Sequence, residues 1–212
     1  MITGRKMDIY AERIRKMRIW LARHGETDWN TNNWIQGHTN TDLNETGRQQ
    51  AAFLGQRILE EKLPITKIYA STLKRSQQTA QIAAKIAGVP CLVEAGLEEI
   101  SLGAWEGMTW KEAAEAYPKE TEEWNRDRRY NTPPGGECYQ DVLDRMVAAI
   151  RRICDRETED VLIVTHAGSI RILLTYVNGT EFTAEAMKQY QTPNGSIREL
   201  DLEKLWQVEG SE

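Results

Sequence analysis

The chain has 212 residues, with 27 Lys and Arg against 32 Asp and Glu, and carries a formal charge of −5 at pH 7. A protein that binds nucleic acid without sequence preference needs a basic surface, so this charge argues against such a role but leaves a small anionic ligand open. A hydrophobic content of 40% is too high for a disordered chain, and the length favours one domain.

No apolar run approaches the roughly 20 residues that cross a bilayer, and the first residues lack the apolar segment of a secretory signal. We therefore expect a cytoplasmic protein with no membrane partner. The three cysteines, Cys91, Cys138 and Cys154, show no CxxC spacing and cannot all pair. This favours free thiols over a disulfide framework or a cysteine zinc site.

The first sixteen residues are rich in charge and predict an N-terminal extension, flexible or partly helical, with Met17 as an alternative start. The first strand is expected at Arg18–Ala22, a short apolar run rich in strand formers. Similar runs predict strands at 67–70, 161–165 and 197–202.

Helix patterns lie between these strands. Asn44 can cap a helix that continues to about Glu61, and an Ala- and Gln-rich helix over 73–87 ends before Gly88. A third helix, over 139–156, places its apolar residues on one face. Strands that alternate with helices predict an α/β fold, a three-layer α/β/α sandwich with a mostly parallel sheet, in which residues 17–212 form a single domain.

The segment 105–137 has a different composition, with five aromatic residues among many charges and a Pro-Pro-Gly-Gly sequence near its end. It predicts short helices and a loop over one edge of the sheet, where lids and specificity elements are usually found. We expect a small helical cap over the active site.

Histidine is scarce, and two of the three histidines, His24 and His166, directly follow predicted strands; the third is His38. Ligands of parallel α/β sheets bind outside the carboxyl ends of the strands, so His24 and His166 should share one crevice. Arg75 lies in the first turn of a helix that begins at the same edge, and Arg23 adjoins His24. Two guanidinium groups, each with paired N–H donors, beside two imidazoles are typical of a site that binds a phosphoryl group.

Five segments resemble, in the same order, the signature blocks of the histidine phosphatase superfamily, the phosphoglycerate mutase-like family that is named for its Arg-His-Gly motif. They are LARHGETDWN from Leu21, STLKRSQQTA from Ser71, LEEISLGAWEG from Leu97, PGGECYQD from Pro134 and VTHAGSIR from Val164. Arg-His-Gly alone is a weak signal, but five blocks in order make a chance match improbable. The blocks span nearly the whole chain.

The resemblance implies a role for each central residue. His24 would attack phosphorus to form a phosphohistidine that water then hydrolyses. Arg23, Arg75 and His166 would bind the equatorial oxygens, with His166 as an imidazolium. Glu99 would protonate the leaving alkoxide and later take a proton from water, because the family's acid precedes a small hydrophobic-Gly element.

Other positions follow from the same blocks. A misalignment of one residue would exchange Glu99 with its neighbour Glu98. Cys138 replaces the serine usual in the family's Gly-Glu-Ser element, so a hydroxyl contact is not carried over there. The resemblance implies substrate contacts from Asn30, Gln36, Gly37, His38 and Ala167. For His38, an exposed loop histidine is an equally good interpretation.

The resemblance favours the phosphatase branch: a phosphomonoesterase for small phosphorylated metabolites that needs no metal and no cofactor, since cationic side chains take the role of Mg²⁺. Mutases of the family carry a longer insertion than the 67 residues from Glu99 to His166 allow. A phosphoglycerate mutase, a sugar bisphosphate phosphatase and a noncatalytic phospho-ligand binding protein remain alternatives. A homodimer is also left open.

Three arginines in the expected cap, Arg126, Arg128 and Arg129, precede its Pro-rich end. An arginine cluster is usually a solvated face. If these arginines line the pocket instead, they favour substrates with a second anionic group, such as sugar bisphosphates or phosphoglycerates.

Overall fold

The computed structural model describes residues 17–209, so the extension expected at 1–16 lies outside the described residues. Five strands form one sheet in the order β3-β2-β4-β1-β5. They are β1 (Ile19–Arg23), β2 (Lys67–Ala70), β3 (Cys91–Val93), β4 (Val161–Thr165) and β5 (Ile197–Leu200). All neighbouring pairs are parallel except β1 with β5, which confirms the expected mostly parallel sheet.

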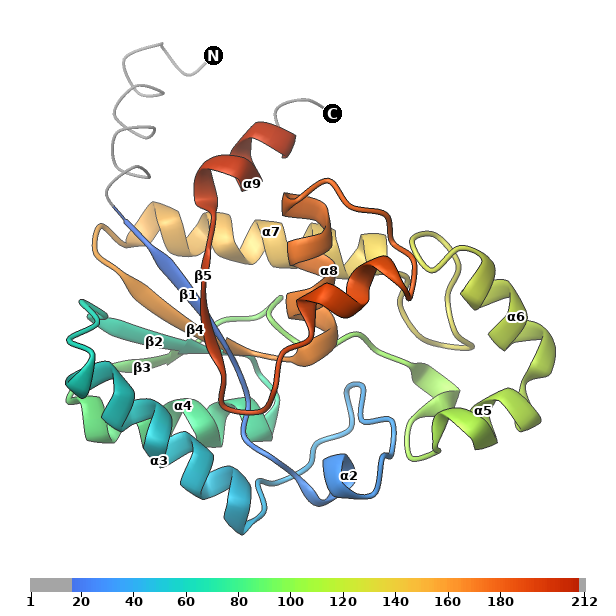
Figure 1. The fold of residues 1–212 in the computed structure, drawn as a ribbon, viewed down its shortest axis with the longest axis horizontal. Coiled ribbons are helices and arrows are strands. Elements are labelled where there is room, and N and C mark those ends of the chain that lie inside the picture. Colours follow the sequence, from blue (N-terminus) through green and yellow to red (C-terminus); the bar gives the residue numbers. More distant parts are fainter. Residues whose placement is uncertain (1–16, 210–212) are drawn as a thin grey trace.

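Helices cover both faces of this sheet. Figure 1 shows α3 and α4 on one face and α7 and α8 on the other, which confirms the three-layer sandwich. The helices are α2 (Asp28–Thr31), α3 (Glu45–Glu60), α4 (Lys74–Ala87), α5 (Trp110–Ala116), α6 (Pro118–Arg126), α7 (Tyr139–Arg156), α8 (Ala167–Val177) and α9 (Leu202–Glu209). Two short 3₁₀ helices lie at Gly103–Trp105 and Ala186–Tyr190.

Each face of the sheet has its own apolar core. Leu54 of α3 and Ala83 of α4 pack with Ile68 of β2 in one cluster of buried side chains. Met146 and Ile150 of α7 belong to the other, larger cluster. Burial of apolar surface on both faces holds the strands rigidly, and with them the loops at their carboxyl ends.

The helix boundaries follow the signals in the sequence. The side chain of Asn44 accepts a hydrogen bond of 2.8 Å from the backbone N–H of Gly47, so it caps α3 as expected. Helix α4 ends at Gly88, whose φ of +71° lies in the left-handed region that glycine adopts without strain.

Strand β3 and helices α2, α8 and α9 were not predicted from the sequence. Strand β3 has only three residues, and eight of the eleven residues of α8 are buried, so α8 has no polar face to reveal its period. The strand expected at 197–202 ends at Leu200. Asp201 accepts the backbone N–H of Lys204 at 2.9 Å and thereby turns the chain into α9.

The segment 105–137 forms the expected small cap. Helices α5 and α6 lie to one side of the sheet in Figure 1. Thr109 and Glu112 form a reciprocal capping box at the start of α5, and Pro118 opens α6. Trp105 and Trp124 are buried in the same apolar cluster as α7, so the cap is packed onto the sandwich.

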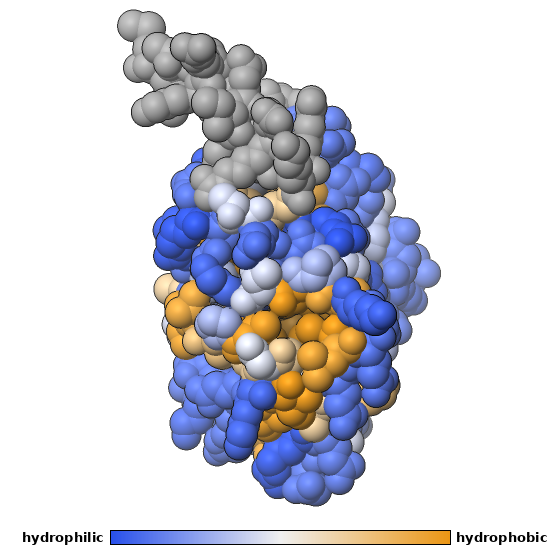
Figure 2. All heavy atoms as spheres, turned by 90° about the vertical axis from the view of Figure 1, so that its left-hand side faces the viewer, coloured by the Kyte–Doolittle hydropathy of each residue, from blue (hydrophilic) through white to orange (hydrophobic). Residues whose placement is uncertain are grey.

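One face of the molecule carries an apolar patch. Figure 2 looks at the left-hand side of Figure 1, where β3 forms the edge of the sheet, and shows hydrophobic residues within a hydrophilic surround. Leu92 and Val93 of β3 are 42% and 52% exposed. Within residues 17–209, no helix combines the length and apolar character needed to span a membrane.

Candidate active site

His24 and His166 come together because β1 and β4 are parallel neighbours. Arg23 pairs with Thr165 at the ends of these strands, and the N–H of His24 donates to the carbonyl of Thr165 at 2.9 Å. The two imidazole rings therefore lie side by side, with centroids 5.1 Å apart. Both side chains are buried, at the carboxyl ends of the parallel strands.

The ring of His24 is held in one orientation. Its Nδ1 lies 2.7 Å from the carbonyl oxygen of Gly25, and because a carbonyl only accepts, Nδ1 carries the proton. The lone pair is then on Nε2, where the Nε of Arg75 donates at 3.3 Å. A Cβ on Gly25 would lie 2.3 Å from the carbonyl oxygen of Gly47, so only glycine fits this turn.

Burial lowers the pKa of His24 well below its ordinary value, and the charges of Arg75 and Arg23 add to this effect. The imidazole is therefore neutral at physiological pH. A neutral ring with an unprotonated Nε2 can attack an electrophilic phosphorus atom, because the nucleophilic lone pair is not taken up by a proton.

His166 is fixed by a residue that the sequence analysis did not single out. Its Nε2 lies 2.7 Å from Oγ of Ser71, and its buried Nδ1 has no hydrogen-bond partner among the described residues. Burial, followed by the charge of Arg75, lowers the pKa of His166 well below its ordinary value. The ring is thus neutral in the free protein, whereas the imidazolium that the resemblance implies is expected beside a phosphate dianion.

Arg75 is fully buried and aimed at the nucleophile. Its two terminal nitrogens donate to the carbonyl oxygens of Thr39 and Gly37, at 2.9 and 2.8 Å. Burial lowers its pKa to about 10, so it stays cationic at physiological pH. Arg23 donates through Nη1 to the carbonyl of Thr192, whereas its buried Nε has no partner among residues 17–209.

Glu99 reaches the same cavity from the segment after β3. Its Oε1 accepts the backbone N–H groups of Ile100 and Ser169, and its Oε2 accepts that of Gly168 at 3.0 Å. Two of these donors belong to the first turn of α8, directly after His166. The carboxylate is therefore attached to the same element that carries the second histidine.

Glu98 points elsewhere. Its carboxylate accepts from Thr72 Oγ1 at 2.7 Å and from the N–H of Gly96, and it lies 3.8 Å from Arg145. These hydrogen bonds and the charge of Arg145 outweigh burial and lower the pKa of Glu98. Glu99 lines the cavity and Glu98 does not.

The cavity in front of His24 has a volume of about 190 Å³. Four of the five expected substrate contacts, Asn30, Gln36, Gly37 and Ala167, line it. His38 does not: its Nε2 donates to the carbonyl of Glu99 at 2.7 Å, and its side chain is 42% exposed. A Cβ on Gly37 would overlap the carboxylate of Glu106.

Four aromatic residues that the sequence analysis did not assign to the pocket form one wall of the cavity: Trp34, Trp110, Trp124 and Tyr139. Trp110 and Trp124 belong to the cap, and their rings stack with planes 14° apart. Arg128 also lines the cavity, with its guanidinium 4.2 Å from the centroid of the Trp124 ring. Arg126 and Arg129 border a separate cavity.

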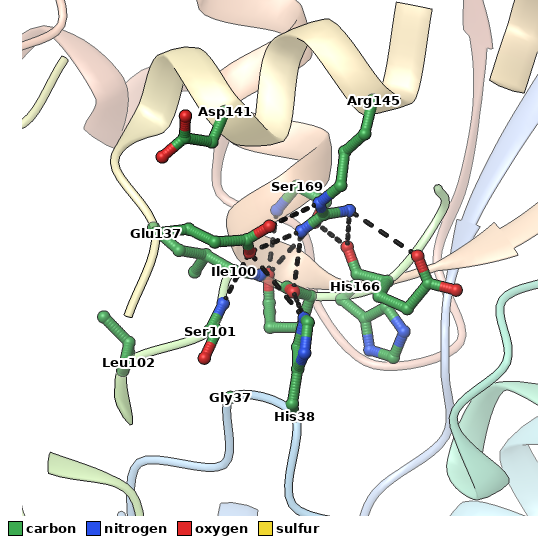
Figure 3. Close-up of polar contacts among 12 residues, drawn as sticks. Gly37, His38, Ile100, Ser101, Leu102, Glu137, Asp141, Arg145, His166 and Ser169 are labelled. Carbon is green, nitrogen blue, oxygen red and sulfur yellow. Dashed lines mark hydrogen bonds and ion pairs between the residues drawn. The ribbon is translucent and has the colours of Figure 1, made fainter. Parts of the chain in front are cut away.

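An ion pair between Arg145 and Glu137 supports the segment that carries Glu99 (Figure 3). Arg145 of α7 donates to the carbonyl oxygens of Gly96, Glu98 and Glu99 at 2.8 to 3.1 Å. It also forms two bonds to Glu137, whose Oε2 accepts the N–H of Ser101 at 2.8 Å. The backbone is thus held on both sides of Glu99.

Within residues 17–209, no cluster of three or more His, Cys, Asp or Glu side chains could hold a metal ion. Positive charge in the cavity comes from arginine side chains. Four line it, Arg23, Arg75, Arg128 and Arg171, against the single carboxylate of Glu99.

Comparisons with known proteins agree with this geometry. A family model described as "Histidine phosphatase superfamily (branch 1)" matches residues 19–208. The chain is 38% identical to "Phosphoglycerate mutase-like protein 4" of Arabidopsis thaliana, over 77% of this chain and 72% of that protein. It is 37% identical to the "Metal-independent phosphoserine phosphatase" of the same plant, over 73% of this chain and 66% of the relative.

A solved structure of Bacillus stearothermophilus YhfR is similar over most of the chain. It superposes with a TM-score of 0.75 at 33% identity, covering 87% of this chain and 91% of that one.

Proposed function

The chain belongs to the histidine phosphatase superfamily and is a phosphoric monoester hydrolase, and we propose that His24 is the residue that takes up the phosphoryl group. The observation that carries this assignment is the state of its ring: neutral, proton on Nδ1, and Nε2 facing the cavity beside Arg75. The substrate would be a small phosphorylated metabolite.

In the first step, Nε2 of His24 attacks phosphorus in line, the N–P bond forms and the bond from phosphorus to the alcohol oxygen breaks. Arg23, Arg75 and His166 supply donors for the equatorial oxygens, which carry the charge of a loose transition state. The unpartnered Nε of Arg23 and Nδ1 of His166 support this role, because a buried polar atom without a partner is costly unless a ligand satisfies it.

Glu99 would supply the proton that the leaving alkoxide needs. A water molecule then attacks the phosphohistidine, Glu99 takes the proton of that water, and inorganic phosphate leaves with His24 restored. The position of Glu99 on the cavity wall supports this assignment, as do its bonds to the first turn of α8.

Steady-state hydrolysis of p-nitrophenyl phosphate by wild type and by His24→Ala tests the proposal. We expect turnover without added metal in the wild type and a loss of at least about 10³-fold in His24→Ala. Equal turnover would refute the covalent role of His24. Binding of phosphate esters with no turnover by the wild type would instead indicate a noncatalytic phospho-ligand binding protein.

A mutase is the second candidate, favoured by the similarity to "Phosphoglycerate mutase-like protein 4". In a mutase the phosphoryl group returns from His24 to substrate before water arrives. Incubation with 3-phosphoglycerate and a bisphosphate primer separates the two activities: formation of 2-phosphoglycerate shows a mutase, and release of inorganic phosphate shows a phosphatase.

The single-domain boundaries, the cytoplasmic location and the homodimer stay predictions. Limited proteolysis, cell fractionation and light scattering at several protein concentrations test them in turn.

A further inference from the structure

Ser71 is a buried residue that contacts the second histidine of the site. It directly follows β2, and His166 directly follows β4, the parallel neighbour of β2. Both side chains are fully buried, and Oγ of Ser71 lies 2.7 Å from Nε2 of His166. Either atom could be the donor of this hydrogen bond, because the hydroxyl carries a proton and Nε2 carries one in one of the two imidazole tautomers.

The other contacts of Ser71 decide which atom donates. Its Oγ already accepts the backbone N–H of Leu73 at 3.3 Å. Among the described residues, Nε2 of His166 is the only hydrogen-bond partner that can accept the hydroxyl proton. If Nε2 carried a proton instead, a buried hydroxyl would be left without an acceptor, which costs free energy. The hydroxyl of Ser71 therefore donates, and Nε2 of His166 accepts.

The backbone of Ser71 is fixed, so its hydroxyl keeps this direction. The N–H of Ser71 donates to the carbonyl of Val164 at 3.3 Å and to Oγ of Ser76 at 3.0 Å. Ser76, in the first turn of α4, in turn donates to the same carbonyl at 2.7 Å. Ser71 is thus tied to β4, the strand that leads into His166.

An accepting Nε2 determines where the proton of His166 lies. A neutral imidazole carries one proton, so this proton is on Nδ1. Nδ1 is buried without a partner among residues 17–209, which makes it an N–H donor that a ligand can satisfy. A second proton would have to go to Nε2, where the hydroxyl of Ser71 already donates. The positive charges of Arg75, Arg145 and Arg23 also disfavour a second proton.

We propose that Ser71 is a positioning residue that fixes His166 as the Nδ1–H tautomer, so that His166 donates to the transferring phosphoryl group as a neutral imidazole. This inference rests on the proposed function, in which His166 binds the equatorial oxygens. It differs from the imidazolium that the resemblance implies, because no proton has to enter the buried site before the reaction.

¹⁵N NMR of protein labelled at its three histidines measures the tautomer directly, since ring nitrogens with and without a proton have different shifts. The signals of His166 are those lost in His166→Asn. We expect the Nδ1–H tautomer in the wild type, both free and with inorganic phosphate. His24, whose Nδ1 faces the carbonyl of Gly25, is the internal reference for this tautomer. In Ser71→Ala the Nε2–H tautomer of His166 should appear.

The rate should change in a way that a purely structural role would not produce. In Ser71→Ala we expect kcat to fall by about 10- to 100-fold with KM nearly unchanged, less than the loss of a whole oxyanion donor, because bound phosphate can itself select the Nδ1–H form. The loss should be equal for p-nitrophenyl phosphate and glycerol 3-phosphate, since His166 acts on the phosphoryl oxygens and not on the leaving group. Ser71→Cys keeps a weaker donor of similar shape, so its loss should be smaller, and it serves if Ser71→Ala does not fold.

Ser76→Ala is the matched control. It removes a hydroxyl that is equally buried and belongs to the same segment, but that bonds the backbone of Val164 and Ser71 and not the imidazole. Urea unfolding should show a loss of stability in both alanine variants. Ser76→Ala should keep the tautomer of His166 and the kcat of the wild type.

The two levels of the account fail separately. An Nε2–H tautomer of His166 in the wild type, or a second ring proton in the phosphate complex, overturns the role of Ser71 and leaves the phosphatase function intact. The same holds if Ser71→Ala keeps the wild-type tautomer, or if Ser76→Ala loses as much kcat as Ser71→Ala. A wild type that does not hydrolyse p-nitrophenyl phosphate refutes the proposed function itself, whichever tautomer is observed. The Nδ1–H tautomer in the wild type, lost together with kcat in Ser71→Ala alone, supports the proposal.

Discussion

The imidazole rings of His24 and His166 lie 5.1 Å apart, and both are buried and neutral in the free protein. Each ring has one nitrogen fixed by the fold, by Gly25 in one case and Ser71 in the other. Of the remaining nitrogens, Nδ1 of His166 has no partner among the described residues, and Nε2 of His24 accepts only from Nε of Arg75 at 3.3 Å. The proposed roles of nucleophile for His24 and oxyanion donor for His166 rest on these two nitrogens.

The two buried histidines should make stability depend on pH. Burial lowers the pKa of both below its value in the unfolded chain, about 6.5, so the unfolded state binds more protons below that pH. Stability is full above about pH 6.5 and falls as the pH drops from there toward the folded-state pKa, by up to about 1.4 kcal/mol per pH unit for each histidine.

Urea unfolding between pH 7.5 and 5 measures this slope. The free energy of unfolding should fall more steeply in the wild type than in His166→Asn, which lacks one of the two groups. Equal slopes in the two proteins would contradict the assignment of a neutral, buried His166.

Glu99→Gln should slow alkyl phosphates far more than activated aryl phosphates. An alkoxide leaves poorly without a proton, so we expect a loss of about 10² to 10⁴-fold in kcat on glycerol 3-phosphate. On p-nitrophenyl phosphate, whose leaving group needs no proton, the loss should stay below about 10-fold. Glu98→Gln is the matched control, because its carboxylate binds Thr72 and Gly96 instead. A larger loss of kcat on glycerol 3-phosphate in Glu98→Gln than in Glu99→Gln would make Glu98 the proton donor instead.

Arg145 should act on the reaction through Glu99. Its bonds to the carbonyl oxygens of Gly96, Glu98 and Glu99 hold the backbone that carries the acid. Arg145→Met should therefore reproduce the leaving-group signature of Glu99→Gln in weaker form, with about a 10-fold greater loss on alkyl than on aryl phosphates.

Arg152→Met controls for a purely structural effect of Arg145. Arg152 lies on the same helix, two turns further on, and bonds Glu94 and the carbonyl of Ala95, just before the segment that Arg145 holds. If both variants lose the same stability but only Arg145→Met changes the leaving-group dependence, Arg145 is a positioning residue. The same dependence in both variants would make it structural.

Patterns in short stretches of sequence predicted the helices and strands that depend on contacts between residues close together in the chain. The sheet, α3, α4 and α7 follow from apolar periodicity and from Asn44 and Gly88, and the two post-strand histidines follow from the parallel topology. Helix α8 was not predicted because most of its residues are buried, so it shows no helical alternation of apolar and polar residues. Helix α9 was not predicted because the residues before it, 197–202, have the composition of a strand, and the Asp201 carboxylate that caps the helix lies within them.

Contacts between distant segments could not be predicted. Ser71, directly after β2, bonds His166, directly after the neighbouring strand β4, and Arg145 of α7 donates to the carbonyl oxygen of Glu99 in a loop far away in the sequence. Neither pairing leaves a signal in the spacing of the chain. Arg171 ends the segment VTHAGSIR, but only the structure shows that it lines the cavity and that its buried Nε has no hydrogen-bond partner among the described residues.

The most direct measurement is the phosphoenzyme itself. Wild type and His24→Ala are mixed with a ³²P-labelled alkyl phosphate, quenched in alkali within milliseconds and assayed for protein-bound label that is stable to alkali and released by acid, as a phosphohistidine is. Such label in the wild type, formed and lost at rates that match turnover, and its absence in His24→Ala are the predicted result. Turnover of the wild type without such label, or equal labelling of His24→Ala, would contradict the assignment of His24 as the nucleophile.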